Sequence, residues 1–418
     1  MRRRKSPKTK NDNTAIKPPN RRKYYGVYFE VLQIFRTFAV NYTAIKKTIM
    51  YLHQRKDWPN FTWDTDTLLP HVSNVRDLQG RLIGKMEAMG FNLREEAVLE
   101  ILTEDIVKSS EIEGEILNNL EVRSSVARRL GMEISGLPNA SRDVEEVVEL
   151  LLDATQKYES PLTKDRMCGW HAALFPTGRS GMNKITVGDW RGDAQGPMQI
   201  VSGAIGKEKV HYTAPESPRL EKEMKQFIDW FNTDKSTEPV IKSAIAHLWF
   251  VSIHPFDDGN GRIARAIADS LLARADRTNQ RFYSMSSQIL KAKNDYYAIL
   301  ESTQKGSMDI SQWLVWYFER LKNALEATET LSKTMVKARF WELYKNTQFS
   351  ERQIEMINKL HGDFVGKLHA SKWAKMTKVH RDTARRDIQD LIKKGVLLDS
   401  GEGGRSTNYI LNLPTLNS

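Results

Sequence analysis

The chain has 418 residues, enough for two or three domains with cores of their own. Its single cysteine, Cys168, excludes an intrachain disulfide and favours a reducing compartment, and no apolar run is long enough to predict a membrane helix. The net charge of +11 belongs to the two ends, because residues 1–49 hold 13 basic and 2 acidic residues and residues 337–418 hold 15 and 9, whereas residues 50–336 hold 35 and 41. Charge therefore does not indicate a nucleic-acid role for the middle of the chain.

Residues 1–49 are rich in Pro, Asn and Lys and lack an apolar period, which predicts a basic, disordered extension. A coherent globular pattern begins at Met50, so we interpret Met50 as the natural start and 1–49 as an upstream extension. A targeting peptide and a nucleic-acid-binding arm are the alternatives for this segment.

Residues 50–135 are expected to form a helical module. Apolar residues recur at helical spacing from Leu68 to Met86, and again from Val98 to Ile106. The second helix leads into Ser109-Ser-Glu-Ile-Glu113-Gly114, which places a carboxylate at a helix end.

Residues 136–335 predict a mainly α structure. Helical runs cover residues 144–151, 220–231, 240–253, 263–272 and 310–321. A loop rich in Gly begins at Gly188-Asp-Trp-Arg191, and β-branching predicts a short strand at Gln199-Ile200-Val201, followed by Ser202. We expect this to be the only β element of the region. Met167 and Trp170 beside Cys168 indicate that this thiol is simply buried.

The stretch His254-Pro-Phe-Asp-Asp-Gly-Asn-Gly-Arg-Ile-Ala-Arg265 gathers the chemistry of a polyphosphate site. His254 can accept a proton near neutral pH, and Asp258 can hold a Mg²⁺ on the phosphates. The turn Gly259-Asn260-Gly261 can adopt the positive-φ conformations of a phosphate-binding backbone, at the N-terminus of a helix. Arg262 and Arg265 can each bind phosphate oxygens in a forked manner. Because no Gly-Lys-Ser/Thr follows, the stretch is not a Walker A loop, and it is not a dinucleotide fingerprint either.

These residues resemble the Fic motif, HPFx(D/E)GNGRxxR, at every defined position. The resemblance implies an α-helical core that transfers AMP from ATP to a Ser, Thr or Tyr hydroxyl of a target protein. It implies that His254 deprotonates that hydroxyl, that Phe256 faces the core and that Asp258 ligates Mg²⁺. It further implies an anion hole at Gly259–Gly261 and phosphate binding by Arg262 and Arg265. Some relatives with lysine in place of Gly261 phosphorylate their targets, so the glycine favours adenylylation.

A second resemblance concerns regulation. Ser109, Glu113 and Gly114 fit the family's inhibitory pattern, (S/T)xxxE(G/N). By resemblance Glu113 pairs with Arg265 and prevents productive ATP binding, which a partly buried ion pair can achieve with a few kcal/mol. The sequence therefore predicts an enzyme that is mostly switched off.

The resemblance assigns two more regions to the site. It implies a hairpin, the flap, at Gln199–Ser202, which clamps a target backbone by strand pairing; an ordinary surface hairpin is the alternative. It also implies that Tyr296 and Gln304 contact the nucleoside, although the second position is often asparagine in the family. Plain core packing is the alternative for the tyrosine.

Residues 336–418 predict a different kind of domain. Two helices, 368–375 and 379–394, end at Gly395, and two strands, 396–398 and 408–411, flank a Gly-rich turn at 401–404. This order resembles a winged helix-turn-helix. It would present basic residues of the second helix to DNA, with a wing arginine near phosphate, and docking to a protein is the alternative. The residues concerned are His380, Arg381, Thr383, Arg385, Arg386 and Arg405.

The leading hypothesis is thus an autoinhibited protein adenylyltransferase that uses ATP and Mg²⁺ in a bacterial cytoplasm. One alternative is a transcriptional regulator that senses ATP without turnover, and another is removal of AMP by the same site, with Glu113 aligning a water. Members of the family often form dimers, so a homodimer is one expectation, and no membrane partner is expected.

Overall fold

The computed structural model describes residues 50–88, 91–132, 136, 138–194, 196–203, 207–362, 364, 366–399 and 408–412. These residues belong to one compact unit, Tyr51–Ser418, apart from Met50. The basic extension predicted at 1–49, the turn at 401–404 and Arg405 lie outside the described residues.

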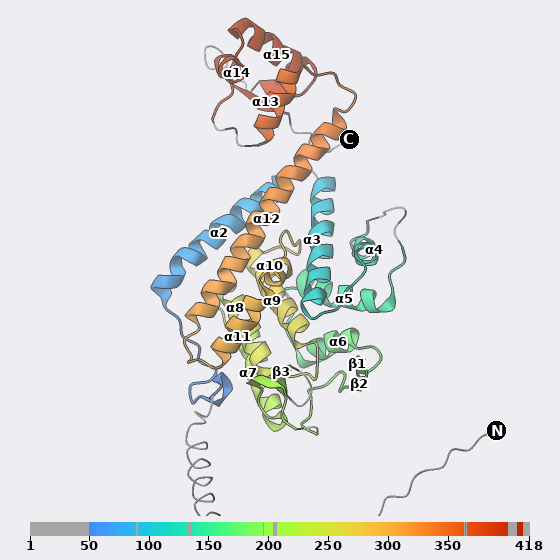
Figure 1. The fold of residues 1–418 in the computed structure, drawn as a ribbon, viewed down its shortest axis with the longest axis vertical. Helices are drawn as coiled ribbons and strands as arrows, with labels where there is room; N and C mark the ends of the chain where they lie inside the picture. The colour runs from blue at the N-terminus through green and yellow to red at the C-terminus, as the bar shows by residue number, and fades with distance from the viewer. Residues whose placement is uncertain are drawn as a thin grey trace, which may run out of the picture. The chain divides into compact units, whose positions relative to one another are not determined.

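The prediction of a mainly α fold is confirmed (Figure 1). In chain order the helices are η1 (Leu52–Gln54), α2 (Thr65–Ala88), α3 (Phe91–Ile112), α4 (Asn119–Arg129), α5 (Arg142–Gln156), α6 (Lys164–Leu174), α7 (Ser217–Thr233), α8 (Pro239–Ile253), α9 (Asn260–Asp276), α10 (Met285–Lys291), α11 (Lys293–Gln304), α12 (Ser311–Leu343), α13 (Glu351–His361), α14 (Ala370–Thr377) and α15 (Arg381–Lys393). The strands are β1 (Arg179–Ser180), β2 (Asn183–Lys184), β3 (Gln199–Ser202), β4 (Lys209–Thr213), β5 (Leu397–Asp399) and β6 (Tyr409–Leu411), paired in sequence order into three antiparallel sheets.

Helices α8 and α9 form the centre of the larger core. Helix α8 is buried on all sides from Val240 to Ile253, as expected of a helix that is apolar all round. Pro239 starts it, and the Glu238 carboxylate caps it by accepting hydrogen bonds from the backbone N–H groups of the next two residues. Helix α9 is nearly as buried and packs along α8. The loop between them, residues 254–259, is therefore anchored at both ends by the most rigid part of the fold.

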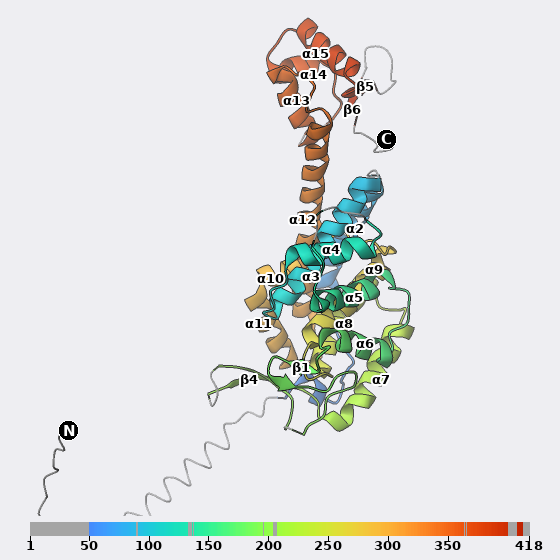
Figure 2. The same ribbon diagram turned by 90° about the vertical axis from the view of Figure 1, so that its right-hand side faces the viewer.

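The two predicted N-terminal helices are confirmed as α2 and α3. Of the apolar residues at helical spacing, Leu68, Val75, Leu78, Leu82 and Met86 of α2 and those from Val98 to Ile106 of α3 are buried, whereas Val72 is half-buried. Helix α2 runs beside α12, and α3 packs against α10 and α4 (Figures 1 and 2). The C-terminal end of α3 consequently reaches the N-terminal part of α9, with which it makes direct side-chain contacts.

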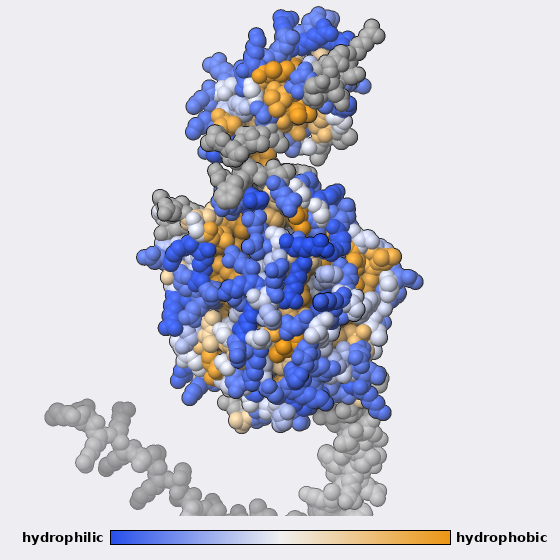
Figure 3. All heavy atoms as spheres, turned by 180° about the vertical axis from the view of Figure 1, so that it is seen from behind, coloured by the Kyte–Doolittle hydropathy of each residue, from blue (hydrophilic) through white to orange (hydrophobic). Residues whose placement is uncertain are grey.

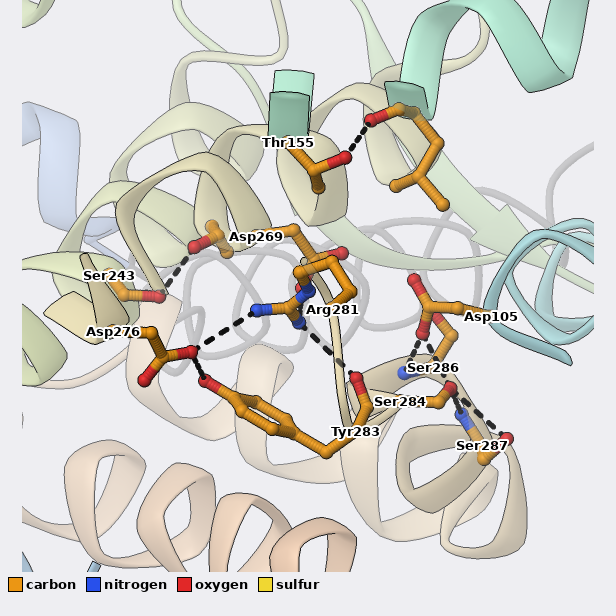
Figure 4. A network of polar contacts seen from close by, with 12 residues as sticks. Asp105, Thr155, Ser243, Asp269, Asp276, Arg281, Tyr283, Ser284, Ser286 and Ser287 are labelled. Atoms are coloured by element: carbon orange, nitrogen blue, oxygen red, sulfur yellow. Dashed lines mark hydrogen bonds and ion pairs between the residues drawn. The ribbon is translucent and has the colours of Figure 1, made fainter. Parts of the chain in front are cut away.

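A buried polar network fixes α3 relative to α9 (Figure 4). The Arg281 guanidinium donates to Asp269 Oδ1 of α9 over 2.7 Å, and Tyr283 donates its hydroxyl proton to Asp276 over 2.6 Å. On α3, Asp105 Oδ1 accepts a hydrogen bond from the Ser286 backbone N–H at 3.1 Å. Burial raises the pKa of both α9 carboxyls. Removing a partner from a buried ion pair costs about 3–5 kcal/mol, so Arg281 holds its segment firmly against α9, and Asp105 joins α3 to the same segment by hydrogen bonds.

The prediction of a single β element before residue 335 is wrong, because β1 and β2 form a second hairpin. Each of these strands has two residues, too few for the alternation of polar and apolar side chains that reveals a strand in a sequence. Cys168 is buried as predicted, and burial raises the pKa of its thiol to about 11.

The C-terminal helices α13, α14 and α15 share a second core with β5, β6 and the end of α12. The predicted second helix, its terminating Gly395 with φ of +72°, and the two strands are confirmed. The first predicted helix begins two residues later, at Ala370, and α13 was not predicted. Helix α12 continues to Leu343, past the boundary expected at 335.

The surface seen from behind is mostly hydrophilic, with separate hydrophobic patches (Figure 3). Within the described part of the chain, each helix is too short or too polar to traverse a lipid bilayer.

Candidate active site

His254 occupies a strained position at the C-terminal end of α8. Its φ and ψ of +52° and +59° are left-handed, a conformation that costs a residue other than glycine about 1–3 kcal/mol. The Nδ1 atom lies 3.3 Å from the Val251 carbonyl oxygen. If the ring is neutral, Nδ1 carries the proton and donates it to this acceptor, which leaves Nε2 as the basic nitrogen.

The surroundings of His254 keep its ring neutral. Burial first, and then the positive charge of Arg191, lower the pKa of His254 to about 4. The Val251 carbonyl and the carboxylates of Asp258 and Glu113 act in the opposite direction. Near neutral pH the side chain is thus an unprotonated base.

Arg191 holds the backbone of this histidine. Its Nε donates to the His254 carbonyl oxygen over 2.8 Å, and its backbone N–H donates to the Pro255 carbonyl oxygen over 2.9 Å. The side chain is completely buried and forms an ion pair with Asp193 at 3.0 Å. Arg191 thereby satisfies a carbonyl that the end of a helix leaves without an intrahelical partner.

The loop from Phe256 to Asn260 is closed by one side chain. Asn260 Oδ1 accepts from the Phe256 backbone N–H at 3.0 Å, and Asn260 Nδ2 donates to the Phe256 carbonyl oxygen at 2.8 Å. Phe256 is fully buried and stacks on His171 at 4.2 Å. At Gly259, whose φ is +77°, a Cβ atom would lie 2.8 Å from the Phe175 ring, so glycine is required there for both conformation and space.

Asp258 lies exposed directly before α9. One of its carboxylate oxygens accepts a hydrogen bond from the Ser180 hydroxyl of β1. Among the described residues, no group of three or more His, Cys, Asp or Glu side chains is arranged to hold a metal ion. A single accessible carboxylate nevertheless fits Mg²⁺, which commonly takes one or two carboxylates together with substrate phosphates and water.

Arg265 is fully occupied by the end of α3. Its Nε donates to Ser109 Oγ over 2.9 Å, its Nη2 donates to the Ser109 carbonyl oxygen over 2.8 Å, and its Nη1 lies 2.8 Å from Glu113 Oε1. The arginine side chain is 3% exposed and that of Glu113 is 30% exposed. Gly114 follows with φ of +90°, a left-handed conformation that glycine adopts without a steric penalty.

Glu113 also fills the space above Gly261. A Cβ atom at Gly261 would lie 2.1 Å from Glu113 Oε1. The absence of a side chain at position 261 is therefore necessary for the carboxylate to reach Arg265.

Arg262 forms an ion pair with a carboxylate from the same segment, the residues that follow α3. Its Nη1 pairs with Glu115 Oε2 at 2.5 Å, and its guanidinium lies over the Phe175 ring at 5.2 Å. Burial raises the pKa of Glu115, and Arg262 partly offsets that effect. Both arginines that the sequence assigned to phosphate binding are thus paired with acidic residues from the segment that follows α3.

Tyr296 and Gln304 are buried on α11. Tyr296 is 2% exposed and its hydroxyl lies 2.8 Å from His247 Nε2, while Gln304 Nε2 donates to Ser252 Oγ over 3.3 Å. The neighbouring Tyr297 is 43% exposed and donates to the Ile112 carbonyl oxygen at the end of α3.

A hairpin forms where the flap was predicted. Strands β3 and β4 pair from Gln199 with Thr213 to Ser202 with Lys209, with an irregularity between Ile200 and Val201. Every residue of β3 is exposed. From β4, Tyr212 donates its hydroxyl proton to the Ser252 carbonyl oxygen, which anchors the hairpin on α8.

The structure thus gathers His254, the 258–262 turn, Arg265 and Glu113 at one place, whereas the basic residues of α15 are exposed on a helix whose apolar face packs in the second core. Sequence reasoning missed the roles of Arg191, Glu115 and Ser180 in these contacts. The only available signal was that Arg191 and Glu115 each stand beside a segment already singled out.

Comparison with known proteins agrees with this geometry. Residues 161–272 match the model of the Fic/DOC family, and residues 51–132 match a domain of unknown function, DUF4172. Residues 161–272, which contain His254 and both arginines, are therefore a Fic/DOC domain.

Several curated relatives are named protein adenylyltransferases. The chain is 37% identical over 82 residues to protein adenylyltransferase fic-1 of Caenorhabditis elegans, covering 18% of this chain and 16% of the relative. It is 25% identical over 229 residues to protein adenylyltransferase Fic of Nematostella vectensis, covering 51% of this chain and 45% of that one. A probable protein adenylyltransferase of Aquifex aeolicus is 26% identical over 187 residues, covering 41% and 56%. The matches thus span 16% to 56% of these relatives' lengths.

Among solved structures, a Fic family protein from Desulfovibrio desulfuricans is 19% identical with a TM-score of 0.48, covering 84% of this chain and 97% of that one. Fic-1 from C. elegans is 19% identical with a TM-score of 0.44, covering 64% and 74%.

Proposed function

We propose that this protein transfers AMP from ATP to a Ser, Thr or Tyr hydroxyl of a target protein, and that Glu113 keeps it mostly inactive. The observation that carries the proposal is the 2.8 Å ion pair between Glu113 and Arg265, beside a histidine held as a neutral base. A buried arginine in the second turn of a helix, beside glycines that leave the helix N-terminus accessible, suits a phosphate better than a permanent structural carboxylate.

In the proposed reaction His254 Nε2 takes the proton of the acceptor hydroxyl. The hydroxyl oxygen then forms a bond to the α-phosphorus of ATP, and the bond from that phosphorus to the β-phosphate bridging oxygen breaks. Pyrophosphate leaves, and the proton remains on His254. A pKa of about 4 means that the base is ready at neutral pH, and general-base catalysis of this kind contributes about 10²–10⁴-fold in rate.

The phosphates would be bound at the N-terminus of α9. Backbone N–H groups between Gly259 and Gly261 point to that end of the helix, whose dipole favours an anion. Arg262 and Arg265 would each exchange a carboxylate for phosphate oxygens. Asp258 would hold Mg²⁺, which when bound would neutralise charge on the phosphates.

Inhibition would follow from competition for Arg265. While Glu113 occupies Nη1 and the space over Gly261, a phosphate cannot take the same place. Ser109 fixes the other two guanidinium nitrogens, so the arginine cannot turn toward a differently placed phosphate. Glu113 would thus permit ATP binding only in an unproductive pose.

Label transfer tests this function. We would incubate wild type, Glu113→Gly and Glu113→Gly/His254→Ala with host lysate, Mg²⁺ and ATP labelled at the α or the γ phosphorus. We expect α-label in protein, weak in the wild type, strong in Glu113→Gly and lost in the double variant. Label from the γ position would instead indicate a kinase.

Two further outcomes identify the alternatives. ATP binding without transfer from either position would favour an ATP-sensing regulator. Loss of AMP from a previously labelled protein, dependent on Glu113, would show that the site runs in reverse.

We further propose that α13–α15 with β5 and β6 form a winged helix-turn-helix. Support comes from the order of these elements, from the bridge between Leu368 and Tyr409, and from the basic side chains of α15. Arg381, Arg385 and Arg386 are exposed while Ala384 and Ile388 are buried, so one face of the helix is basic and the other packs inward. Phosphate binding by these arginines would make DNA affinity fall steeply with salt, which a titration at two salt concentrations measures.

A further inference from the structure

The left-handed backbone of His254 runs against two local preferences. A side chain with a Cβ atom disfavours φ near +52°, and a residue that precedes proline, as His254 precedes Pro255, favours an extended backbone. Contacts from elsewhere must therefore hold the conformation. The shortest side-chain contact to this backbone comes from Arg191, 63 residues away in sequence.

Arg191 connects His254 to the hairpin β3–β4. While Nε donates to the His254 carbonyl oxygen, Nη2 donates to the Pro215 carbonyl oxygen over 2.6 Å. Pro215 follows Ala214, whose backbone N–H donates to the Met198 carbonyl oxygen at the start of the hairpin. One buried planar guanidinium thus links the histidine itself to the base of the hairpin, while Tyr212 of β4 anchors the hairpin on α8 at Ser252. A lysine cannot reproduce this fork, because its charge is a compact point on a flexible stem.

In the proposed reaction, the two segments that Arg191 joins act on the acceptor and not on the nucleotide. Strand β3 is exposed along its length and could pair with an acceptor backbone, and His254 Nε2 is the basic nitrogen. The phosphate side is built from the end of α3 and the start of α9, which are different elements.

We infer that Arg191 is a positioning residue that fixes His254 Nε2 relative to the β3 strand, and so determines which hydroxyl of a paired acceptor segment reaches the base. This inference rests on the proposed function. Tyr212 holds the hairpin on α8, and Arg191 is the side chain that bonds to the His254 backbone itself. Loosening Arg191 should therefore impair transfer to the acceptor and leave nucleotide binding intact.

The test compares Arg191→Lys, Arg191→Met and Asp193→Asn, all in a Glu113→Gly background. Three quantities are measured: the affinity for a non-hydrolysable ATP analogue, kcat and KM for transfer to the acceptor, and the titration of the His254 ring by NMR, assigned with His254→Ala. Asp193→Asn is the matched control, because it removes the ion pair at Nη1 and leaves the two bonds to carbonyl oxygens. Mass spectrometry identifies the modified residues.

For Arg191→Lys we expect kcat to fall about a hundredfold, as for a misplacement of about 1 Å, with ATP-analogue affinity and His254 titration unchanged. New acceptor hydroxyls should also become modified. Arg191→Met should show the same loss of kcat and a higher pKa of His254, because a nearby positive charge is removed. Asp193→Asn should stay close to the parent.

Three results would overturn the inference. If Arg191→Lys lowers only the thermal midpoint while kcat per folded molecule is kept, the residue is merely structural. If ATP-analogue affinity falls along with kcat, Arg191 shapes the whole site. If the Glu113→Gly parent itself transfers nothing, the proposed function fails, and an unchanged His254 titration in Arg191→Met then shows separately that Arg191 does not hold the ring.

Discussion

The site has two halves, which the proposed function assigns to the nucleotide and to the acceptor. Different kinds of contact hold the residues of each half in place. On the nucleotide half, Arg262 and Arg265 pair with Glu115 and Glu113, whose side chains are 47% and 30% exposed. On the acceptor half, His254 is fixed by the buried Arg191 through bonds to carbonyl oxygens. Ion pairs with accessible carboxylates can be exchanged for phosphates, whereas buried bonds to the backbone have no competitor.

This difference indicates in which half the contacts can change during regulation. Replacing a carboxylate by a phosphate on a buried arginine substitutes one anion for another, so the arginine never stays uncompensated. Moving His254 would instead release a left-handed backbone and leave carbonyls without donors. We therefore expect regulation to act on the nucleotide half and the geometry of the base to remain constant.

Among substitutions in the nucleotide half, removing the charge of Glu113 should have the largest effect on transfer. Glu113→Gln keeps the shape of the side chain and weakens its attraction to Arg265, so transfer should rise about tenfold or more, the range of a coupling of 1–3 kcal/mol. Single-turnover transfer of α-label measures it. Glu111→Gln is the control, because Glu111 sits near the same helix end and pairs with Lys108. Equal activation of Glu113→Gln and Glu111→Gln would show that the ion pair with Arg265 is not what inhibits transfer.

The pH dependence of transfer tests whether His254, the base of the acceptor half, stays neutral. With a His254 pKa of about 4, the base stays unprotonated as pH falls through 6.5, and transfer should decline only on approaching pH 4. At pH 5 the rate should be about thirtyfold higher than for a histidine with its ordinary pKa of 6.5. Single-turnover rates of Glu113→Gln between pH 4.5 and 8 give the profile, with circular dichroism to confirm folding. Half-maximal transfer near pH 6.5 would contradict a base held neutral by burial.

What the sequence could predict was local. The central helices follow from apolar spacing, and the residues from His254 to Arg265 are neighbours in the chain, so their grouping required no knowledge of the fold. The pairing of Glu113 with Arg265 was expected only from resemblance, and the structure places the two side chains together.

The missed contacts share a physical reason. Arg191 reaches His254 across 63 residues, Ser180 reaches Asp258 across 78, and Glu115 reaches Arg262 across 147. A side chain that binds a carbonyl oxygen or a distant ion leaves no periodic pattern in its own neighbourhood. The length of α12 was missed for a related reason, since Phe340 near its end is buried in the second core and not in the first.

Gly261→Ala would show whether inhibition needs the free space above position 261 as well as the charge of Glu113. The new Cβ atom would lie 2.1 Å from Glu113 Oε1 and 3.3 Å from Arg265 Nη1, so the carboxylate must move away. We expect a destabilisation of about 1–3 kcal/mol from overpacking, and weaker dependence of transfer on Glu113. Chemical denaturation measures the loss of stability. A double-mutant cycle with Glu113→Gln measures how strongly transfer still depends on Glu113. Gly169→Ala on α6 is the matched control, because nothing lies within 4 Å of its added Cβ and alanine favours the helix.

The smallest expected effect belongs to Glu115. Its side chain is 47% exposed, so Glu115→Gln should raise transfer by no more than about fivefold, the range of an exposed ion pair. The Glu115→Gln substitution is most informative when it is combined with Glu113→Gln in a double variant. Glu113 and Glu115 stand two residues apart on one segment, and the charge of Glu113 raises the pKa of Glu115, so the two carboxylates are coupled.

Glu113 and Glu115 could leave the two arginines together, as one unit. In that case Glu113→Gln already frees most of this segment, and adding Glu115→Gln changes the transfer rate and the ATP affinity little. If the two increments instead multiply, each arginine is freed separately. Isothermal titration with an ATP analogue on the four proteins of the cycle decides between these cases. Multiplication would mean that Arg262 and Arg265 can take up phosphates one at a time, with Arg262, the more weakly held of the two, receiving the nucleotide first.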